Sequence, residues 1–246
     1  MINPIYLNGN VVTLHMMTYR RRSTNKDNVY TVAKALRLKY KDYAHNNRRN
    51  PLDELLFILC SVKTTSPSYQ STYRTFRNTF PKFKDVAQAS ECSLATALSS
   101  GGLQNIKAKA IKRLMSVLEE CFGKPTLSPL REMTDEEVEK FLVSLPGVGK
   151  KVARCIMMYS LDRQVFPVDT HCWRVSSRLG WIRGKSSTGH HTDRDADRLQ
   201  EKIPKELRFS LHVNMVSLGR NICTFHNPKC VICPISIYCN NSIAHT

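Results

Sequence analysis

The pattern of hydrophobic and polar positions predicts short amphipathic helices along most of the chain. From about Val29 onward, apolar residues recur at intervals of three and four, the spacing that gathers them on one face of an α-helix. The stretch 51–62 starts with proline and an early acidic pair and then becomes fully apolar, as expected of a buried helix. Strand-like alternation is scarce, so the pattern predicts an all-α fold built from short helices.

Two further helices carry end signals of their own. Thr134 and Glu137 form a capping-box pattern before the apolar run "VEKFLVSL", which predicts that a helix starts there. Residues 107–123 end at a glycine, a common helix terminator, and place five apolar side chains on one helical face: Ile111, Leu114, Met115, Leu118 and Phe122.

The first 28 residues differ from the rest of the chain. The stretch "IYLNGNVVTL" at 5–14 predicts a short hairpin around Asn8-Gly9-Asn10. It is followed by "RRRSTNKDN" at 20–28, which is typical of a polar linker. Residues 1–28 are therefore predicted to be a basic N-terminal extension.

Composition and charge narrow the classes of function. The chain has 246 residues, of which 41% are hydrophobic, so a sizeable core can be buried. Lys and Arg number 37 against 20 Asp and Glu, a net charge of +17, which favours a polyanion such as nucleic acid. No apolar run approaches the roughly 18 residues of a membrane span, and no signal-peptide pattern is present. We therefore expect an intracellular protein without a membrane partner, located in the nucleoid or cytoplasm of a prokaryote or the nucleus of a eukaryote.

The stretch "LPGVGKKVA" at 145–153 joins two amphipathic helices within 134–161. Gly147 and Gly149 are predicted to take positive φ and to expose backbone N–H groups at the start of the second helix. A helix N-terminus with free amides binds anions, phosphate among them. In so basic a chain, this turn is predicted to contact a nucleic-acid backbone.

This turn resembles the helix-hairpin-helix of the DNA glycosylase superfamily, and more closely that of the endonuclease III family. Three further stretches carry the resemblance, which covers about residues 30–240: "LLFILCSVKTT", "SSGGLQNIKAKAI" and "FPVDTHCWRVSSRLGW". It implies a two-lobed all-α fold. A helical barrel would span 46–163, and 29–45 would join 164–246 in a second lobe carrying an iron–sulfur loop.

The resemblance also implies two catalytic residues. Lys151 matches the family's lysine nucleophile, which monofunctional members lack, and we expect the helix N-terminus and Lys150 to lower its pKa. Asp169 matches the catalytic aspartate, whose carboxylate stabilises positive charge at the sugar and assists proton movement. The alternatives are a phosphate contact for Lys151 and an ordinary helix N-cap for Asp169.

The implied function is excision of damaged or modified pyrimidines from double-stranded DNA in base excision repair. The enzyme would be a monomeric bifunctional glycosylase that also cleaves abasic sites. One alternative is the same fold acting on mismatched thymine or modified cytosine. A second alternative is an iron–sulfur DNA-binding protein without catalytic activity.

Base excision requires extrusion of the target nucleotide and a side chain that fills the gap. Leu103 matches the family's wedge, while Lys63 stands where the family normally has glutamine, which leaves the excised base open. The predicted DNA-binding residues are Lys63, Leu103, Gln104, Gly147, Gly149, Lys150 and His171.

Four of the nine cysteines lie close together near the C-terminus. Cys223, Cys230, Cys233 and Cys239 are separated by six, two and five residues, a set that suits either a [4Fe–4S] cluster or a tetrahedral zinc ion. Their spacing is similar to that of the endonuclease III loop, which implies a structural [4Fe–4S] cluster. The other five cysteines are predicted to be small buried residues.

Overall fold

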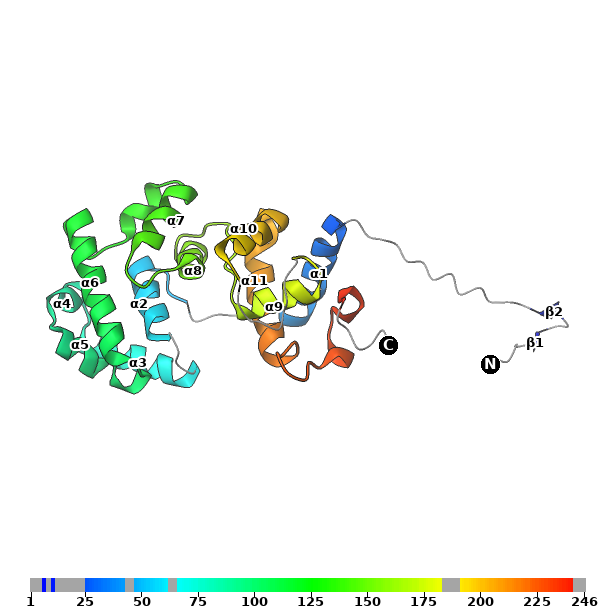
Figure 1. Ribbon diagram of the computed structural model, residues 1–246, viewed down its shortest axis with the longest axis horizontal. Coiled ribbons are helices and arrows are strands. Elements are labelled where there is room, and N and C mark those ends of the chain that lie inside the picture. The colour runs from blue at the N-terminus through cyan, green and yellow to red at the C-terminus, as the bar shows by residue number, and fades with distance from the viewer. Residues whose placement is uncertain are drawn as a thin grey trace.

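A computed structural model of the chain describes residues 6–7, 10–11, 25–42, 47–61, 66–182 and 191–240. Figure 1 shows helices arranged in two groups side by side. The first half of the chain contains α1 (Asn25–Tyr40), α2 (Pro51–Ser61), α3 (Ser66–Thr79), α4 (Phe83–Gln88), α5 (Glu91–Ala97) and α6 (Gln104–Phe122). The second half contains α7 (Asp135–Ser144), α8 (Lys150–Ser160), α9 (Thr170–Arg178), α10 (Asp193–Lys202) and α11 (Arg208–Asn221).

The predicted all-α class is confirmed. Short 3-10 turns complete the described elements at Ser99–Gly101, Ser128–Glu132, Lys205–Leu207, Cys230–Ile232 and Ser236–Tyr238. The strands β1 (Tyr6–Leu7) and β2 (Asn10–Val11) pair antiparallel, as the expected hairpin requires. Helix α1 begins at Asn25, so the end of the predicted polar linker is helical.

The first hydrophobic core belongs to a barrel of helices. It gathers buried residues between Leu52 and Val165, with α2 running through its middle; Leu52, Leu55, Leu56 and Cys60 are at most 1% exposed. Helix α6 adds the apolar face expected from its sequence, and α7 and α8 pack against each other. We call this group of helices the barrel lobe.

The second hydrophobic core is built from both ends of the chain. Side chains of α1 pack with those of α9, α10 and α11, and the core extends to Ile235 in the cysteine loop. Helix α11 contacts both α1 and α9. We call this group the C-terminal lobe. The described residues therefore form two separate cores, and the predicted domain boundaries stay a prediction.

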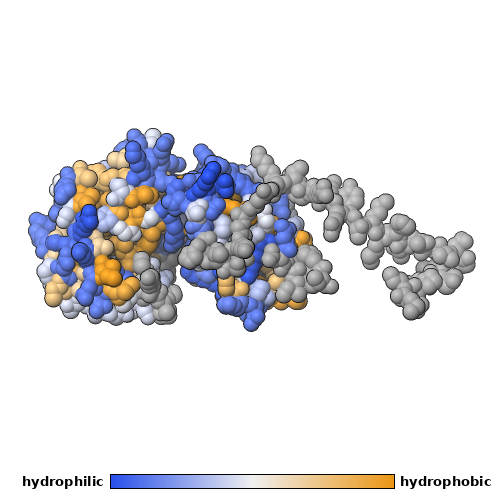
Figure 2. Space-filling model, in the orientation of Figure 1, coloured by the Kyte–Doolittle hydropathy of each residue, from blue (hydrophilic) through white to orange (hydrophobic). Residues whose placement is uncertain are grey.

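Three further features concern the surface, the remaining cysteines and the length of the helices. In the view of Figure 2, hydrophobic residues are gathered mainly on the barrel lobe. Cys60, Cys155 and Cys172 are buried as predicted, whereas Cys92 and Cys121 are exposed, so that prediction was wrong for these two. Within the described part of the chain, no helix has the length and apolar character needed to span a membrane.

Candidate functional site

The turn between α7 and α8 has the geometry of an anion site. The capping box at Thr134 starts α7 as predicted: the Glu137 N–H donates to the Thr134 hydroxyl at 3.3 Å, and the Thr134 N–H donates to the Glu137 carboxylate at 2.9 Å. Gly147 takes the positive φ of 76°. Gly149 does not: its φ of −93° is extended, so the prediction was wrong for this residue.

Gly149 contributes to the turn by leaving open space at the start of α8. It is the N-cap of α8 without any side-chain cap, and a Cβ atom placed on it would meet nothing within 4 Å. The first N–H groups of α8 have no acceptor within the helix. Open space beside these amides leaves room for a phosphate oxygen.

Lys150 points to carboxylates rather than away from the protein. Its Nζ atom lies 2.8 Å from Asp197 Oδ2 and 3.6 Å from Glu139 Oε1. Only 18% of its side chain is exposed. Lys150 was predicted to contact DNA, and nothing in the sequence indicated its pairing with Glu139, 11 positions before it, and Asp197, 47 positions after it.

Lys151, the next residue, is exposed over part of its surface, whereas its amine lies near buried ionisable groups. The Cys155 sulfur is the largest influence raising the pKa of Lys151, burial lowers it, and Asp169 raises it again. The balance lies above the usual lysine pKa, so the expected lowering was wrong. Because burial raises the pKa of Cys155 to about 11, that sulfur is uncharged at neutral pH. At neutral pH, burial and the Asp169 carboxylate therefore act on the pKa of Lys151 in opposite directions.

Asp169 caps α9 and faces the same charges. Its Oδ1 accepts the Cys172 N–H at 2.7 Å, so the N-cap role is present. Burial acts to raise the pKa of Asp169, but His212, the Cys172 N–H and then His171 and Lys151 lower it below its usual value. The carboxylate is thus ionised at neutral pH and able to act on a nearby positive charge.

Two buried residues near this pair were missed by sequence analysis. Glu54 on α2 is fully buried and accepts the Arg48 N–H at 2.6 Å, while burial raises its pKa. His212 on α11 is 3% exposed, and its Nδ1 lies 2.9 Å from the Pro167 carbonyl oxygen. Neither sits in a recognisable motif, and each reaches the site only through packing between distant segments.

The predicted wedge stands on a strained turn. Gly102 and Leu103 both take positive φ, 65° and 52°, a conformation that costs a residue with a side chain free energy. Leu103 is 42% exposed, and Ile106 one turn further is 67% exposed. Gln104, the first residue of α6, is half-buried. Ile106 was not predicted to contribute here, because it lies off the apolar face of α6 that packs into the core.

A buried lysine, Lys107, holds this turn through hydrogen bonds to backbone carbonyl groups. Lys107 is 5% exposed, and its Nζ donates to the carbonyl oxygens of Cys60 at 2.9 Å and Gly101 at 3.0 Å. Cys60 lies near the end of α2, whose carbonyl groups lack helical partners and carry the negative end of the helix dipole. Lys107 thereby ties the Leu103 turn to the end of α2. Lys63, which follows α2, lies outside the described residues.

His171 is half-buried in α9. Its Nδ1 lies 3.0 Å from Arg174 Nη2, and burial lowers its pKa. A Cβ atom on Gly219 would lie 2.7 Å from the His171 Cβ, so glycine permits this close approach of α11 to α9. The proposed DNA contact of His171 stays a prediction.

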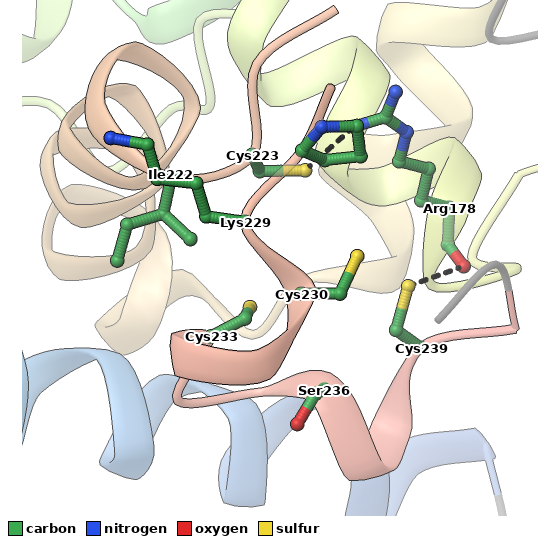
Figure 3. A pocket seen from close by; sticks show the side chains of 9 residues that line it. Arg178, Ile222, Cys223, Lys229, Cys230, Cys233, Ser236 and Cys239 are labelled. Atoms are coloured by element: carbon green, nitrogen blue, oxygen red, sulfur yellow. Dashed lines mark hydrogen bonds between the residues drawn. The ribbon is translucent and has the colours of Figure 1, made fainter. Parts of the chain in front are cut away.

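The four clustered cysteines line one cavity of about 190 Å³, shown in Figure 3. Two arginines of α9 fasten the loop: Arg178 Nη1 donates to Cys223 Sγ at 3.1 Å, and Arg174 Nε donates to the Cys223 carbonyl at 2.8 Å. Among the described residues, no three His, Cys, Asp or Glu side chains converge closely enough to hold a single metal ion.

The chemistry around the cavity suits a sulfur-ligated group. The Tyr40 hydroxyl is buried and has no hydrogen-bond partner among the described residues. Burial, followed by the charges of Cys233 and Cys223, raises the pKa of Tyr40. A buried hydroxyl without an acceptor is costly, and a thiolate or sulfide beside it would remove that cost.

Comparison with known proteins places the chain among base excision repair proteins. A family model described as HhH-GPD superfamily base excision DNA repair protein matches residues 58–202. A provisionally named DNA glycosylase of Arabidopsis thaliana is 34% identical over 190 residues, which cover 76% of this chain. The match spans 62% of the length of that plant relative.

Endonuclease III is similar to the chain in both sequence and structure. The Thermotoga maritima enzyme is 26% identical over 200 residues, covering 81% of this chain and 87% of that protein. A solved structure of a non-covalent endonuclease III–DNA complex superposes with a TM-score of 0.75 and 25% identity. The superposition covers 89% of this chain and 97% of that one.

The Lys107 contacts predict a stability change. Lys107→Met keeps an unbranched side chain of similar length but removes the ammonium that donates to two buried carbonyl groups. The free energy of unfolding should therefore fall by about 1–3 kcal/mol. Chemical denaturation measures it, with Lys109→Met on the exposed face of α6 as the control. Equal stability of the two variants would contradict the buried contacts.

The lowered pKa of Asp169 predicts a pH dependence. Its folded-state pKa lies below the unfolded value of about 3.9, so its contribution to stability is present above that pH and is lost as the pH falls through the folded pKa. The difference in free energy of unfolding between the wild type and Asp169→Asn should therefore shrink on acidification. Asp193→Asn, at an exposed site, is the control. A difference that grows below pH 4 would contradict this sign.

Proposed function

Because the chain belongs to the HhH-GPD superfamily of base excision DNA repair proteins, we propose that it is a bifunctional DNA glycosylase with abasic-site lyase activity. One observation carries the proposal: Lys151, at the open N-terminus of α8, interacts with the ionised Asp169 at the N-terminus of α9. Double-stranded DNA containing a damaged, modified or mismatched base is the proposed partner, bound by a monomer.

Backbone amides and net charge account for binding. The uncapped start of α8 offers N–H donors to a phosphate, and the net charge of +17 attracts the duplex. Leu103, exposed on its strained turn, fills the space vacated by the flipped nucleotide. Ile106 beside it adds apolar surface at the same place.

The first chemical step is displacement of the base. Lys151 transfers a proton to Asp169 and attacks C1′ of the deoxyribose; the C1′–N bond breaks, and the base leaves with the bonding electrons and takes up a proton. Asp169 passes that proton to the departing base, so its carboxylate is charged again and stabilises the cationic sugar, and such electrostatic stabilisation is the larger part of this kind of catalysis. Ring opening then leaves a protonated imine between Lys151 and C1′.

The second step cuts the strand. The imine acidifies the C2′ proton, a base removes it, a C2′=C3′ double bond forms, and the C3′–O bond breaks, which releases the downstream strand with a 5′ phosphate. Water hydrolyses the imine and returns the Lys151 amine. Damaged pyrimidines are the proposed substrates, and mismatched thymine and modified cytosine are the alternatives, since Lys63 departs from the family's usual glutamine.

We propose that the cysteine loop holds a [4Fe–4S] cluster that stabilises the fold. Cys223, Cys230, Cys233 and Cys239 stand around a cavity rather than converging on one point, which suits a cluster with an iron at each corner better than one zinc ion. The Arg178 guanidinium would offset part of the thiolate charge. The cluster's own contribution is to cross-link a loop whose described part has few apolar contacts.

The role of Lys151 is tested by borohydride, which reduces an imine to a stable covalent link. Lys151→Ala should give no trapped complex on abasic DNA, while its DNA affinity stays within about tenfold of wild type because one phosphate-scale contact is lost. Exposed Lys140→Ala should trap normally. Persistent trapping by Lys151→Ala would move the nucleophile to Lys150 or Lys63. A wild type that binds DNA without trapping would favour the non-catalytic alternative.

The cluster is tested by metal analysis. Protein purified anaerobically should be yellow-brown and contain iron and acid-labile sulfide, and Cys230→Ala should lose both. Cys92→Ala, which removes an exposed cysteine elsewhere, should retain them. Zinc without iron or sulfide in the wild type would refute the proposal.

A further inference from the structure

The ion pairs around Lys150 connect the two lobes. Arg154, one turn along α8, is pinned on one side by Glu139 of α7, with Nε 2.7 Å from Oε2. On the other side Arg154 Nη2 contacts Asp197 Oδ1 of α10, and Lys150 Nζ lies 3.0 Å and 2.8 Å from the two Asp197 oxygens. The four residues form two cations and two carboxylates, which we call the lobe brace.

The brace crosses between separately packed bodies. Helices α7 and α8 contribute to the barrel-lobe core through residues such as Leu142 and Ile156. Helix α10 contributes Ala196 and Leu199, the neighbours of Asp197, to the C-terminal core. The brace is well shielded, since the Arg154 side chain is 3% exposed and Lys150 18%, and shielded ion pairs are screened less by salt.

The catalytic pair crosses the same junction. Lys151 belongs to α8 of the barrel lobe, while Asp169 caps α9, whose Cys172 and Trp173 pack in the C-terminal core. Lys150 and Lys151 are consecutive in the first turn of α8, so their side chains diverge by about 100° around the helix. The contact that fixes Lys150 therefore also fixes the direction in which Lys151 leaves the helix.

We propose that Lys150 and Asp197 are positioning residues, which hold the lobes in the arrangement where Lys151 meets Asp169. This rests on the proposed lyase function of Lys151. It replaces the phosphate contact expected for Lys150 from the sequence, because both Asp197 oxygens already accept from its ammonium. DNA contact at the turn is left to the amides of α8.

Two variants separate positioning from phosphate binding. Lys150→Met removes one of the two cations that contact Asp197, whereas Asp197→Asn removes the carboxylate that Lys150 and Arg154 share, and the double variant combines the two changes. Each single variant should slow borohydride trapping on an abasic duplex by about tenfold or more, since small misplacements of reacting groups cost rates of this order. The double variant should be no slower than the slower single variant, because the two changes remove one shared interaction.

Affinity is measured on a duplex containing tetrahydrofuran, an abasic analogue that forms no imine. Both single variants should bind it within about threefold of wild type, with an unchanged salt dependence. Lys140→Met and Asp193→Asn, at exposed positions on α7 and α10, are the charge-matched controls and should trap normally. Lys150→Arg and Asp197→Glu should recover most of the trapping rate, because they keep the charges.

A DNA-free readout separates failure of the brace from failure of the proposed function. Reductive methylation followed by peptide mass spectrometry gives the apparent pKa of Lys151, which should fall in both single variants as Asp169 moves away, and stay unchanged in the controls. If the wild type does not trap, the lyase function fails, and this pKa still decides the positioning role. Wild-type trapping and an unmoved Lys151 pKa in Asp197→Asn would overturn the brace. The brace would also be overturned if Lys150→Met, but not Asp197→Asn, bound the tetrahydrofuran duplex more weakly and with a smaller salt dependence. A slope of log affinity against log salt that is smaller by about 0.9 corresponds to the loss of one phosphate contact.

Discussion

The Lys151 amine and the Asp169 carboxylate are attached to different hydrophobic cores, and the candidate site depends on how those cores are joined. Within the described residues, the junction includes hydrogen bonds at two chain crossings, the ion pairs of Asp197 with Lys150 and Arg154, and the Tyr159 ring packed against α11. At the first crossing the Ser160 hydroxyl donates to the Arg48 carbonyl at 2.6 Å. At the second, the buried Arg208 donates to Gln164 at 2.6 Å and to Ile203 at 3.0 Å. These bonds to backbone carbonyls tie the segment before α2 to the end of α8, and the segment after α8 to the start of α11.

Opposite charges brought together at this junction change what each group can do. The pKa of Asp169 lies below its usual value and that of Lys151 above it, so both groups carry their charges at neutral pH. Binding of DNA inserts a sugar that becomes cationic during reaction, and the site offers it a carboxylate already in place. Because the carboxylate is already in place, the site need not reorganise when the sugar reacts. This prearranged charge is the main physical reason that the site suits the proposed glycosylase chemistry.

Local signals in the sequence were sufficient for the helices and for the chemical groups. The capping box at Thr134, the terminating Gly123 and the N-cap at Asp169 act within a few residues, and all three appear as expected. Leu103 was singled out by a family resemblance, and the four cysteines by their close spacing near the C-terminus. The structure adds that Leu103 is exposed on a positive-φ turn and that the cysteines share a cavity.

Long-range electrostatics could not be predicted in this way. The pKa of Lys151 was expected to fall because its neighbours in sequence are a helix N-terminus and another lysine. In the fold Lys150 is paired with Asp197, and Asp169 from the other lobe acts on Lys151. The burial of Lys107 was missed for a related reason, since its partners Cys60 and Gly101 lie 47 and 6 residues away. From the sequence alone, a lysine on a helix is expected to face solvent, and only the folded positions of its carbonyl partners show that it is buried.

The most direct measurement of the central claim is the identity of the lysine that joins the DNA. Wild-type protein would be reduced with borohydride on an abasic duplex, digested with protease and nuclease, and sequenced by tandem mass spectrometry. The account predicts that the sugar remnant is attached to Nζ of Lys151. A remnant on Lys150 or Lys63, or distributed over several lysines, would contradict it.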